Sequence, residues 1–409
     1  MTEQSAGVVV VGAGLGGIRV AESLRANGYA GPVTLIGAEN HPPYDRPPLS
    51  KSVLLGKDDR VDLKPAEFFA EQHIALRTGE RVNAIAPDEH TVTLERLADP
   101  THSDTLAYDT LSYETLVLAT GLRPRTLPGT ENIAGVHMLR TIDDARALRD
   151  DAKEATSAAV VGAGFIGCEV AASLTELGLT VTLIEPAPTP LAVALGEQIG
   201  ELVMRLHTGR DVDVRTGVGV DEVLSEAGRT TGVRLSDGTV IAAGIVVVGI
   251  GSLPVVDYLD GSGIELAPRE SGGGIACDAR GATSAADVYA LGDVANWRAE
   301  DGRLRRVEHW THTVEQATEV AHRIAQSDNM IPAAPPYFWS DQFGIKIQVL
   351  GNPRATDDVH LVDDDGTKFL AYYSRDGVLT GVVGAGKVGP VMKTRPKLLT
   401  LTPISDVIG

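Results

Sequence analysis

Two stretches of the chain repeat one pattern of apolar and small residues. Residues 158–186 read AAVVGAGFIGCEVAASLTELGLTVTLIEP: an apolar run, a glycine-rich turn, an amphipathic segment and a second apolar run. Short apolar runs are typical of buried parallel strands, and apolar residues three or four apart indicate a helix. Residues 7–37 repeat this order, with Ile18, Ala21 and Leu24 on one helical face. Each stretch therefore predicts a strand, a turn, a helix and a second strand.

Weaker patterns place further elements between and after these two units. Alternating apolar residues in VNAIAPDEHTVTL (82–94) and RTTGVRLSDGTVI (229–241) indicate two β-meanders. Each half of the chain thus contains a unit, a meander and a closing strand. The other elements that we expect are a short helix starting near Ser50 after a proline-rich loop, buried strands within 113–121, 244–251 and 288–291, a helix over 303–325, a linker at 330–336 and mainly antiparallel strands from Tyr337.

The order of these elements predicts an α/β protein of three domains. A chain of 409 residues is too long for one core, and 45 glycines fit a fold with many tight turns. We expect two Rossmann-like dinucleotide-binding domains and a small C-terminal α+β domain. The first domain would be discontinuous, and the expected ranges are 1–113 with 246–329, then 114–245, then 330–409.

A glycine motif with the spacing G-x-G-x-x-G lies at the turn of each unit. In nucleotide-binding turns the first glycine permits the tight turn, the second lets backbone amides approach a pyrophosphate, and the third lets the helix pack on the strand. The phosphate sits at the helix N-terminus, where free amides and the helix dipole favour negative charge. Two dinucleotides are therefore expected, at Gly12, Gly14 and Gly17 and at Gly162, Gly164 and Gly167.

The two units differ at the end of the second strand. Glu185 ends this strand in the second unit, where a carboxylate accepts hydrogen bonds from the ribose hydroxyls of adenosine. A 2′-phosphate would meet like charge there, and residues 186–188 supply no cation, so we expect NADH to be preferred over NADPH. The first unit has Gly37 at this position. Two alternatives stay open for the group that contacts the ribose in this unit: Glu39 or a backbone group.

Charge and cysteine content exclude several classes of partner. The formal charge of −19 argues against nucleic acid and anionic membranes, which need a basic protein face. The two cysteines, Cys168 and Cys277, form no C-x-x-C pair, which is the pattern of a reducing compartment. Residues 1–7 lack a signal-peptide pattern and no apolar run approaches a membrane span, so we expect a soluble cytoplasmic protein.

Nearly the whole chain resembles one family of flavoproteins. The segments that carry the resemblance are VVVGAGLGG, PPYDRPPLSK, TLVLATGLRPR, VVGAGFIGCEVA, VTLIEP, VYALGDVA, VEHWTHTVEQA and YFWSDQFG. In this order they are similar to the two-dinucleotide flavoproteins related to glutathione reductase, and within that family to the NADH-dependent ferredoxin reductases that serve bacterial oxygenases and cytochromes P450. The proline loop and the EHW and YFWSDQ segments are the specific parts, because many flavoproteins share the glycine motifs.

The resemblance implies FAD on the first unit and NADH on the second. It implies that Lys51 and Trp310 lie beside the flavin ring and that Glu169 reaches toward Lys51 near the flavin N5. The other residues implied at FAD are Gly12, Gly14, Gly16 and Gly17 at the pyrophosphate, Arg46 beside the flavin, Val82 near the adenine, Thr120 and Arg125 along the closing loop, and Asp293 at the ribityl chain. Those implied at NADH are Gly162, Gly164, Ile166, Gly167 and Glu185.

The cysteine positions select among the subclasses of this family. Disulfide reductases of this fold pass electrons to a cysteine pair in the loop after the first unit, and residues 41–56 contain no cysteine. The resemblance therefore implies hydride transfer from NADH to FAD and then electron transfer to an outside [2Fe–2S] ferredoxin. A rubredoxin reductase, an NADH oxidase and an NADH-sensing flavoprotein resembling apoptosis-inducing factor stay open as alternatives, as do a monomer and a homodimer.

Docking of an acidic ferredoxin calls for a basic surface, although the chain as a whole is acidic. Such clusters are more often solvated faces than docking sites. The candidates are Arg303, Arg305, Arg306, Lys387, Lys393, Arg395 and Lys397.

Overall fold

The computed structural model describes residues 7–97, 108–327 and 334–408. The described residues form two compact units, each made of segments that are distant in sequence. The first unit takes those of 1–45, 61–123 and 253–332, and the second takes those of 46–60, 124–252 and 333–409. Among the described residues, no helix combines the length and the apolar composition needed to cross a membrane.

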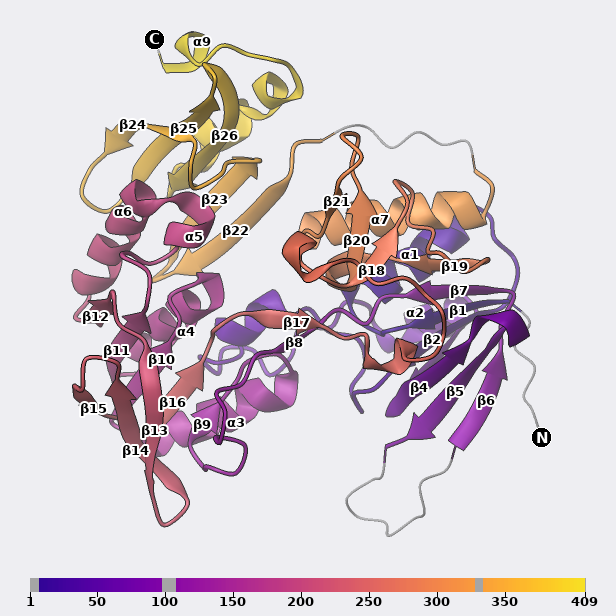
Figure 1. Ribbon diagram of the computed structural model, residues 1–409, viewed down its shortest axis with the longest axis horizontal. Helices are drawn as coiled ribbons and strands as arrows, with labels where there is room; N and C mark the ends of the chain where they lie inside the picture. Colours follow the sequence, from indigo (N-terminus) through magenta and orange to yellow (C-terminus); the bar gives the residue numbers. More distant parts are fainter. Residues whose placement is uncertain (1–6, 98–107, 328–333, 409) are drawn as a thin grey trace. The chain divides into compact units, whose positions relative to one another are not determined.

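The first unit is built on a parallel sheet with the strand order β19-β7-β1-β2-β3 (Figure 1). Its middle strand, β1, is a run of four valines, and such a run is buried on both faces of a covered sheet. Val8 and Val10 share a core with helices α1 and α7, whereas Val9 and Val11 share a core with the meander β4-β5-β6. The period of two along a strand places these pairs on opposite faces.

The bounds of the first unit follow the expected order. In chain order the elements are β1 (Val8–Val11), α1 (Leu15–Ala26), β2 (Val33–Gly37), α2 (Ala66–Glu71), β3 (Ile74–Thr78), β4 (Glu80–Ala86), η2 (Pro87–Glu89), β5 (Thr91–Arg96), β6 (Tyr108–Ser112), β7 (Thr115–Leu118), η3 (Asp257–Leu259), η4 (Arg269–Ser271), β18 (Ile275–Cys277), β19 (Val288–Ala290), η5 (Gly292–Val294), β20 (Ala295–Arg298), β21 (Leu304–Arg305) and α7 (Trp310–Ile324).

The second unit combines a parallel sheet, β12-β11-β10-β16-β9, with an antiparallel sheet, β22-β23-β26-β25-β24 (Figure 1). One face of the parallel sheet shares a core with the meander β13-β14-β15. The other face shares a core with α4, α6 and the antiparallel sheet, so Val160 and Val170 pack in one cluster with Ile347 and Phe369. The C-terminal strands are therefore anchored on helices α4 and α6 of this unit.

The elements of the second unit are η1 (Pro47–Ser50), β9 (Val136–His137), α3 (Ile142–Glu154), β10 (Ser157–Val161), α4 (Phe165–Glu176), β11 (Thr180–Glu185), α5 (Ala192–Leu195), α6 (Glu197–Thr208), β12 (Asp213–Thr216), β13 (Val220–Glu226), β14 (Arg229–Leu235), β15 (Val240–Ala242), β16 (Ile245–Val248), β22 (Tyr337–Gln342), β23 (Ile345–Gly351), β24 (Asp358–Asp364), β25 (Phe369–Arg375), β26 (Val378–Ala385), α8 (Val388–Lys393), η6 (Arg395–Leu399) and α9 (Ser405–Ile408). Strands β8 (Leu122–Pro124) and β17 (Ser252–Pro254) lie where the chain passes between units.

The structure moves the expected domain boundaries. Strand β7, expected to open the second domain, pairs with β1 in the first sheet. Strand β16, expected to return to the first domain, pairs with β10 in the second sheet. Each unit keeps its own closing strand because that strand pairs with the first strand of the same unit. The proline-rich loop is divided: its residues up to Asp45 group with the first unit, and residues 46–60 group with the second.

Two expected helices begin elsewhere. The short helix expected to start near Ser50 is the 3₁₀ turn η1, which ends at Ser50. It starts earlier than expected because Pro47 and Pro48 favour the first positions of a helix. The helix expected over 303–325 begins only at Trp310, since Leu304 and Arg305 pair with β20 as the short strand β21. The other expected strands and both meanders are confirmed, and residues 330–333 of the expected linker lie outside the described ranges.

Candidate functional site

The first glycine turn packs tightly at three positions and is open at one. A Cβ on Gly12, whose φ is +114°, would lie 2.3 Å from the Ala119 carbonyl oxygen. A Cβ on Gly17 would lie 2.0 Å from the Gly12 oxygen, and one on Gly16 would lie 2.6 Å from a methyl of Leu291. A Cβ on Gly14, at the start of α1, would meet no described atom within 4 Å. The open glycine at a helix N-terminus fits the close approach of a pyrophosphate.

The second turn reproduces this geometry. A Cβ on Gly162, with φ +97°, would lie 2.3 Å from the Gly249 oxygen, and one on Gly167 would lie 1.9 Å from the Gly162 oxygen. A Cβ on Gly164 again meets no described atom within 4 Å. Ile166, in the first turn of α4, is half exposed. Both turns therefore fit a dinucleotide, as the spacing of their glycines predicts.

The acid at the end of β11 lies beside the second glycine turn. Glu185 Oε2 accepts a hydrogen bond from the Ala163 amide at 2.7 Å, and Oε1 accepts one from the Ala187 amide at 2.9 Å. This carboxylate is therefore fixed at the position where a ribose is expected. A 2′-phosphate at this place would meet a negative charge that two backbone amides hold in position.

The first unit has no room for such an acid at the same position. Gly37 follows the residue paired with Val11, as Glu185 follows the residue paired with Val161. A Cβ on Gly37 would lie 2.7 Å from the Cβ of Ala13. The carboxylate of Glu39 instead accepts a hydrogen bond from the Tyr44 hydroxyl. Whether Glu39 binds a ribose stays a prediction.

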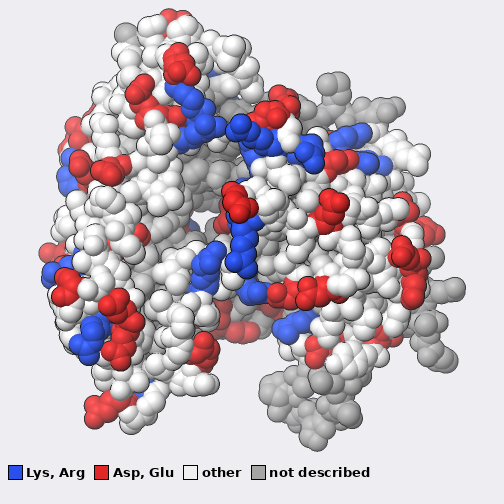
Figure 2. Space-filling model, in the orientation of Figure 1, with Lys and Arg blue, Asp and Glu red and all other residues white. Residues whose placement is uncertain are grey.

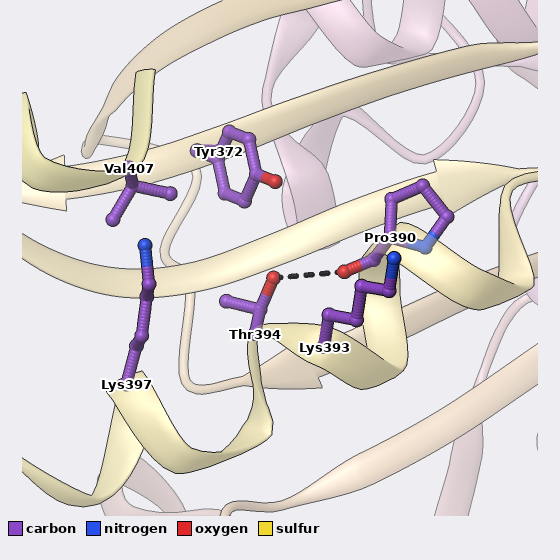
Figure 3. Close-up of a pocket in the computed structure, with 6 residues that line it drawn as sticks. All are labelled: Tyr372, Pro390, Lys393, Thr394, Lys397 and Val407. Atoms are coloured by element: carbon purple, nitrogen blue, oxygen red, sulfur yellow. Dashed lines mark hydrogen bonds between the residues drawn. The ribbon is translucent and has the colours of Figure 1, made fainter. Parts of the chain in front are cut away.

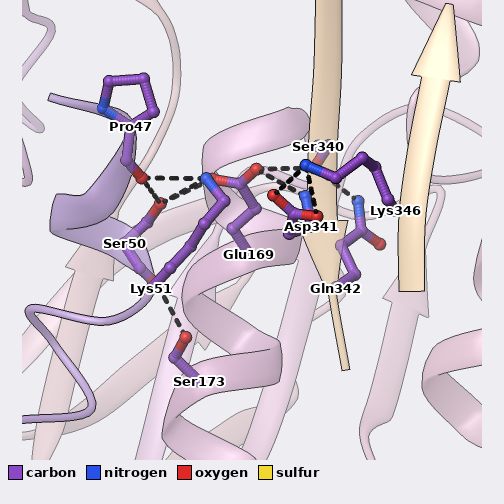
Figure 4. Close-up of polar contacts among 9 residues, drawn as sticks. All are labelled: Pro47, Ser50, Lys51, Glu169, Ser173, Ser340, Asp341, Gln342 and Lys346. Atoms are coloured by element: carbon purple, nitrogen blue, oxygen red, sulfur yellow. Dashed lines mark hydrogen bonds and ion pairs between the residues drawn. The ribbon is translucent and has the colours of Figure 1, made fainter. Parts of the chain in front are cut away.

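Lys51 and Glu169 form an ion pair in the second unit (Figure 4). Lys51 Nζ lies 2.6 Å from Glu169 Oε2, 3.0 Å from the Pro47 oxygen and 3.3 Å from Ser50 Oγ. Ser50 Oγ also donates to Glu169 Oε2 at 2.6 Å. The side chain of Glu169 is 3% exposed and that of Lys51 is 19% exposed. The ammonium is thus held by three oxygens, and Glu169 is a partner of Lys51 as the resemblance implies.

Trp310 opens helix α7 in the first unit, and its ring contacts Asp45 and Arg19. Its indole Nε1 donates to Asp45 Oδ1 at 3.0 Å, and the guanidinium of Arg19 lies 5.6 Å from the ring centroid. The half-buried ring is therefore fixed in orientation rather than packed as an ordinary core aromatic.

Three predicted residues follow neighbouring parallel strands of the first sheet. Gly12 follows β1, Thr120 follows β7 and Asp293 follows β19 within η5. Carboxyl ends of parallel strands meet at one edge of a sheet, which is where ligands bind in such folds. Thr120 Oγ1 donates to the Val255 oxygen at 2.9 Å, so its hydroxyl orients the closing loop.

The other predicted residues have structural contacts of their own. Val82 is buried in β4. Arg46 donates to the Arg140 carbonyl oxygen within the second unit. Arg125 is exposed, and its backbone amide donates to the Gly251 oxygen at 2.9 Å. A ligand role for these three residues stays a prediction.

Both cysteines are buried and free. Burial raises the pKa of the Cys277 thiol to about 12, and burial also raises that of Cys168, which lies in α4 with Sγ 3.5 Å from the Ala163 oxygen. A buried thiol with a raised pKa is a poor nucleophile. Cys168 is therefore a core residue.

Three of the seven basic residues expected for docking form ion pairs with acids. Arg305 pairs with Asp301, Arg306 with Glu308, and Lys387 with Asp363 at 2.6 Å. Figure 2 shows basic side chains beside acidic ones over much of the drawn face.

An open hollow on the C-terminal part is lined by Tyr372, Pro390, Lys393, Thr394, Lys397 and Val407 (Figure 3). Within it, Thr394 Oγ1 donates a hydrogen bond to the Pro390 oxygen at 3.0 Å.

Two contacts of the site carry no signal in the sequence. Asp45 belongs to the proline-rich loop and accepts a hydrogen bond from Trp310, 265 residues away, and no motif near either residue indicates this bond. Ser340 lies in the YFWSDQ segment, and its hydroxyl donates to Glu169, 171 residues away. Both contacts follow only from the folded chain.

Comparisons with known proteins agree with this geometry. Residues 6–317 match the family model described as pyridine nucleotide-disulphide oxidoreductase, and residues 337–403 match the model described as reductase C-terminal. A ferredoxin–NAD(P)(+) reductase from Sphingomonas sp. is 36% identical over 384 residues, covering 92% of this chain and 89% of that protein.

Two solved structures share the fold over almost the whole chain. One is the ferredoxin reductase for the CYP199A2 system from Rhodopseudomonas palustris, with a TM-score of 0.89, 32% identity and coverage of 98% of this chain and 97% of that chain. The other is from the covalent putidaredoxin reductase–putidaredoxin complex, with a TM-score of 0.89, 28% identity and coverage of 100% and 96%.

Proposed function

Because this chain belongs to the pyridine nucleotide-disulphide oxidoreductase family, we propose that it is an FAD-containing reductase that passes electrons from NADH to a small [2Fe–2S] ferredoxin. The ferredoxin in turn serves an oxygenase or a cytochrome P450. The observation that carries the proposal is the duplicated glycine turn, with an open second glycine in each copy and a fixed acid at only one of them. When bound, the flavin supplies the redox chemistry by accepting a hydride from NADH and releasing electrons singly.

The first glycine turn, at Gly12 to Gly17, holds FAD, and the second, at Gly162 to Gly167, holds NADH. In each, amides at the helix N-terminus bind the pyrophosphate. Glu185 binds the adenosine ribose of NADH and disfavours a 2′-phosphate through its charge. This acid supports the choice of NADH over NADPH.

The ammonium of Lys51 stabilises negative charge on the reduced flavin. Three oxygens hold this ammonium, so it is oriented before NADH binds. Glu169 keeps Lys51 in place and balances its charge. Trp310, which Asp45 and Arg19 hold, contacts the flavin ring.

Electrons leave for an outside acceptor without a sulfur relay. Both cysteines of the chain are buried, and neither forms a disulfide. The names of the relatives support a ferredoxin as that acceptor, since the Sphingomonas relative and the Rhodopseudomonas palustris structure are both ferredoxin reductases. Free thiols also support a reducing cytoplasmic compartment.

An anaerobic titration with NADH, followed by visible absorbance, tests the proposal. The purified protein should show a flavin spectrum that one equivalent of NADH bleaches, and NADPH should bleach it far more slowly. Turnover should then require ferredoxin. NADH consumption with rubredoxin or air alone at an equal rate would contradict the acceptor, and a colourless protein that takes up no FAD would contradict the whole proposal.

A further inference from the structure

Glu169 contacts Lys51 through one carboxylate oxygen, and the C-terminal sheet holds the other oxygen (Figure 4). Oε1 accepts hydrogen bonds from Ser340 Oγ at 2.8 Å and from the Asp341 amide at 3.1 Å. Ser340 lies on β22, which packs against α4, and its side chain is fully buried. With Lys51 and Ser50 at Oε2, the carboxylate accepts four donors, which fills its lone-pair positions.

The hydroxyl of Ser340 is itself oriented by two further buried residues. Gln342 Nε2 donates to Ser340 Oγ at 3.1 Å, which leaves the hydroxyl proton for Glu169. Gln342 Oε1 then faces His207 Nε2 at 2.9 Å, so this ring nitrogen carries the proton. Burial lowers the pKa of His207 to about 4, and the ring is neutral at neutral pH. The hydrogen bonds therefore run in one direction, from His207 to Gln342, from Gln342 to Ser340 and from Ser340 to the Glu169 carboxylate.

We propose that Ser340, supported by Gln342, is a positioning residue for Lys51 that acts through Glu169. A rotation of the Glu169 carboxylate would break both hydrogen bonds at Oε1. These two bonds therefore oppose rotation and keep Oε2 in place against the Lys51 ammonium. The C-terminal sheet thus takes part in orienting the cation of the site. The inference rests on the proposed role of Lys51 in flavin reduction, and its test separates the two.

The test compares Ser340→Ala with a matched control, Ser374→Ala. Ser374 is also buried and lies in β25 of the same sheet, but its hydroxyl pairs with His360 Nε2 at 2.8 Å. Each variant removes one buried serine hydroxyl, and only Ser340→Ala removes a donor to Glu169. If Ser340→Ala does not fold, Gln342→Met replaces it, because this change leaves the serine but removes the group that orients it.

The first readout is the acetylation rate of Lys51 in the flavin-loaded protein, measured by mass spectrometry with acetic anhydride. Loss of one ordinary hydrogen bond loosens the ion pair, so Ser340→Ala should raise this rate about fivefold. Ser374→Ala should leave it unchanged. Equal rates in Ser340→Ala and the wild type would overturn the inference.

The second readout is the rate of flavin reduction by NADH in anaerobic stopped flow. Ser340→Ala should slow reduction about fivefold in the wild-type background and not at all in a Lys51→Met background, since the effect passes through Lys51. Equal slowing in both backgrounds would overturn the inference. Faster acetylation with an unchanged reduction rate would instead contradict the role of Lys51 in the proposed function and leave the positioning intact.

Discussion

The indole nitrogen of Trp310 donates a hydrogen bond to Asp45 Oδ1 at 3.0 Å, and this bond ties the start of helix α7 to the proline loop. The guanidinium of Arg19 adds a cation over the same ring. The three side chains come from segments far apart in the chain. Trp310 is thus held in one orientation before any ligand binds.

Replacing Asp45 should loosen this tryptophan. Asp45→Ala removes the hydrogen bond that the half-buried indole N–H donates to Asp45, so we expect the free energy of unfolding to fall by about 1 kcal/mol. Asp45→Asn keeps an oxygen acceptor and serves as the control, with most of the stability retained. Urea unfolding followed by tryptophan fluorescence measures both. Equal losses in the two variants would show that the charge of Asp45 matters rather than its hydrogen bond.

Removing the ammonium of Lys51 should slow flavin reduction. Lys51→Met keeps the length of the side chain but deletes the charge that stabilises the reduced ring, so we expect reduction by NADH to slow about ten- to hundredfold. Lys57→Met is the matched control, because Lys57 lies in the same loop, is 66% exposed and approaches Glu176 only to 3.7 Å. Anaerobic stopped-flow bleaching of the flavin separates the two variants. Unchanged bleaching in Lys51→Met would remove this residue from the mechanism.

The charge of Glu185 should set the preference between the two nicotinamide cofactors. Glu185→Gln keeps one oxygen acceptor but removes the negative charge that repels a 2′-phosphate. We therefore expect the ratio of kcat/KM for NADH to that for NADPH to fall about tenfold, mainly through a lower KM for NADPH. Steady-state kinetics with both cofactors measure this ratio. An unchanged ratio would place the selectivity elsewhere.

Much of each nucleotide-binding unit is predictable because its signals are local. The strand, glycine turn, helix and second strand of residues 7–37 all show in the spacing of adjacent apolar residues, and the structure confirms them. The closing strands β7 and β16 show the limit of such signals. Both are correctly expected as strands, yet their partners are set by pairings such as Val11 with Leu118 and Val161 with Val248. Pairing between strands that lie far apart in the sequence produces no periodic pattern of apolar residues. The domain boundaries expected from the sequence are therefore wrong.

The candidate site divides in the same way. The open positions at Gly14 and Gly164 follow from the motif spacing. The pairing of Lys51 with Glu169 was expected only from the family resemblance. The bonds of Glu169 to Ser340 needed the fold, because β22 reaches α4 only through packing of the C-terminal sheet on the shared core.

Two histidines with lowered pKa values should make the protein lose stability in mild acid. Burial lowers the pKa of His207 from 6.5 to about 4, and it lowers that of His309 to about 4 as well. In the unfolded chain both imidazoles bind a proton as the pH falls below 6.5, whereas in the folded protein they do so only near pH 4. The unfolded state therefore gains protons first, and the free energy of unfolding falls as the pH drops from 6.5 toward 4. For His207 alone the loss between pH 7 and pH 5 should be roughly 2 kcal/mol.

Urea unfolding of the wild type and of His207→Gln at several pH values between 7 and 5 tests this prediction. The variant should lose less stability over this window than the wild type, because one of the two rings with a lowered pKa is no longer present. His73→Gln is the control, since it replaces a histidine that is exposed in the folded protein. If the free energy of unfolding of His207→Gln changed with pH as steeply as that of the wild type, His207 would have the same pKa in the folded and unfolded chain. That result would contradict the lowering of its pKa by burial.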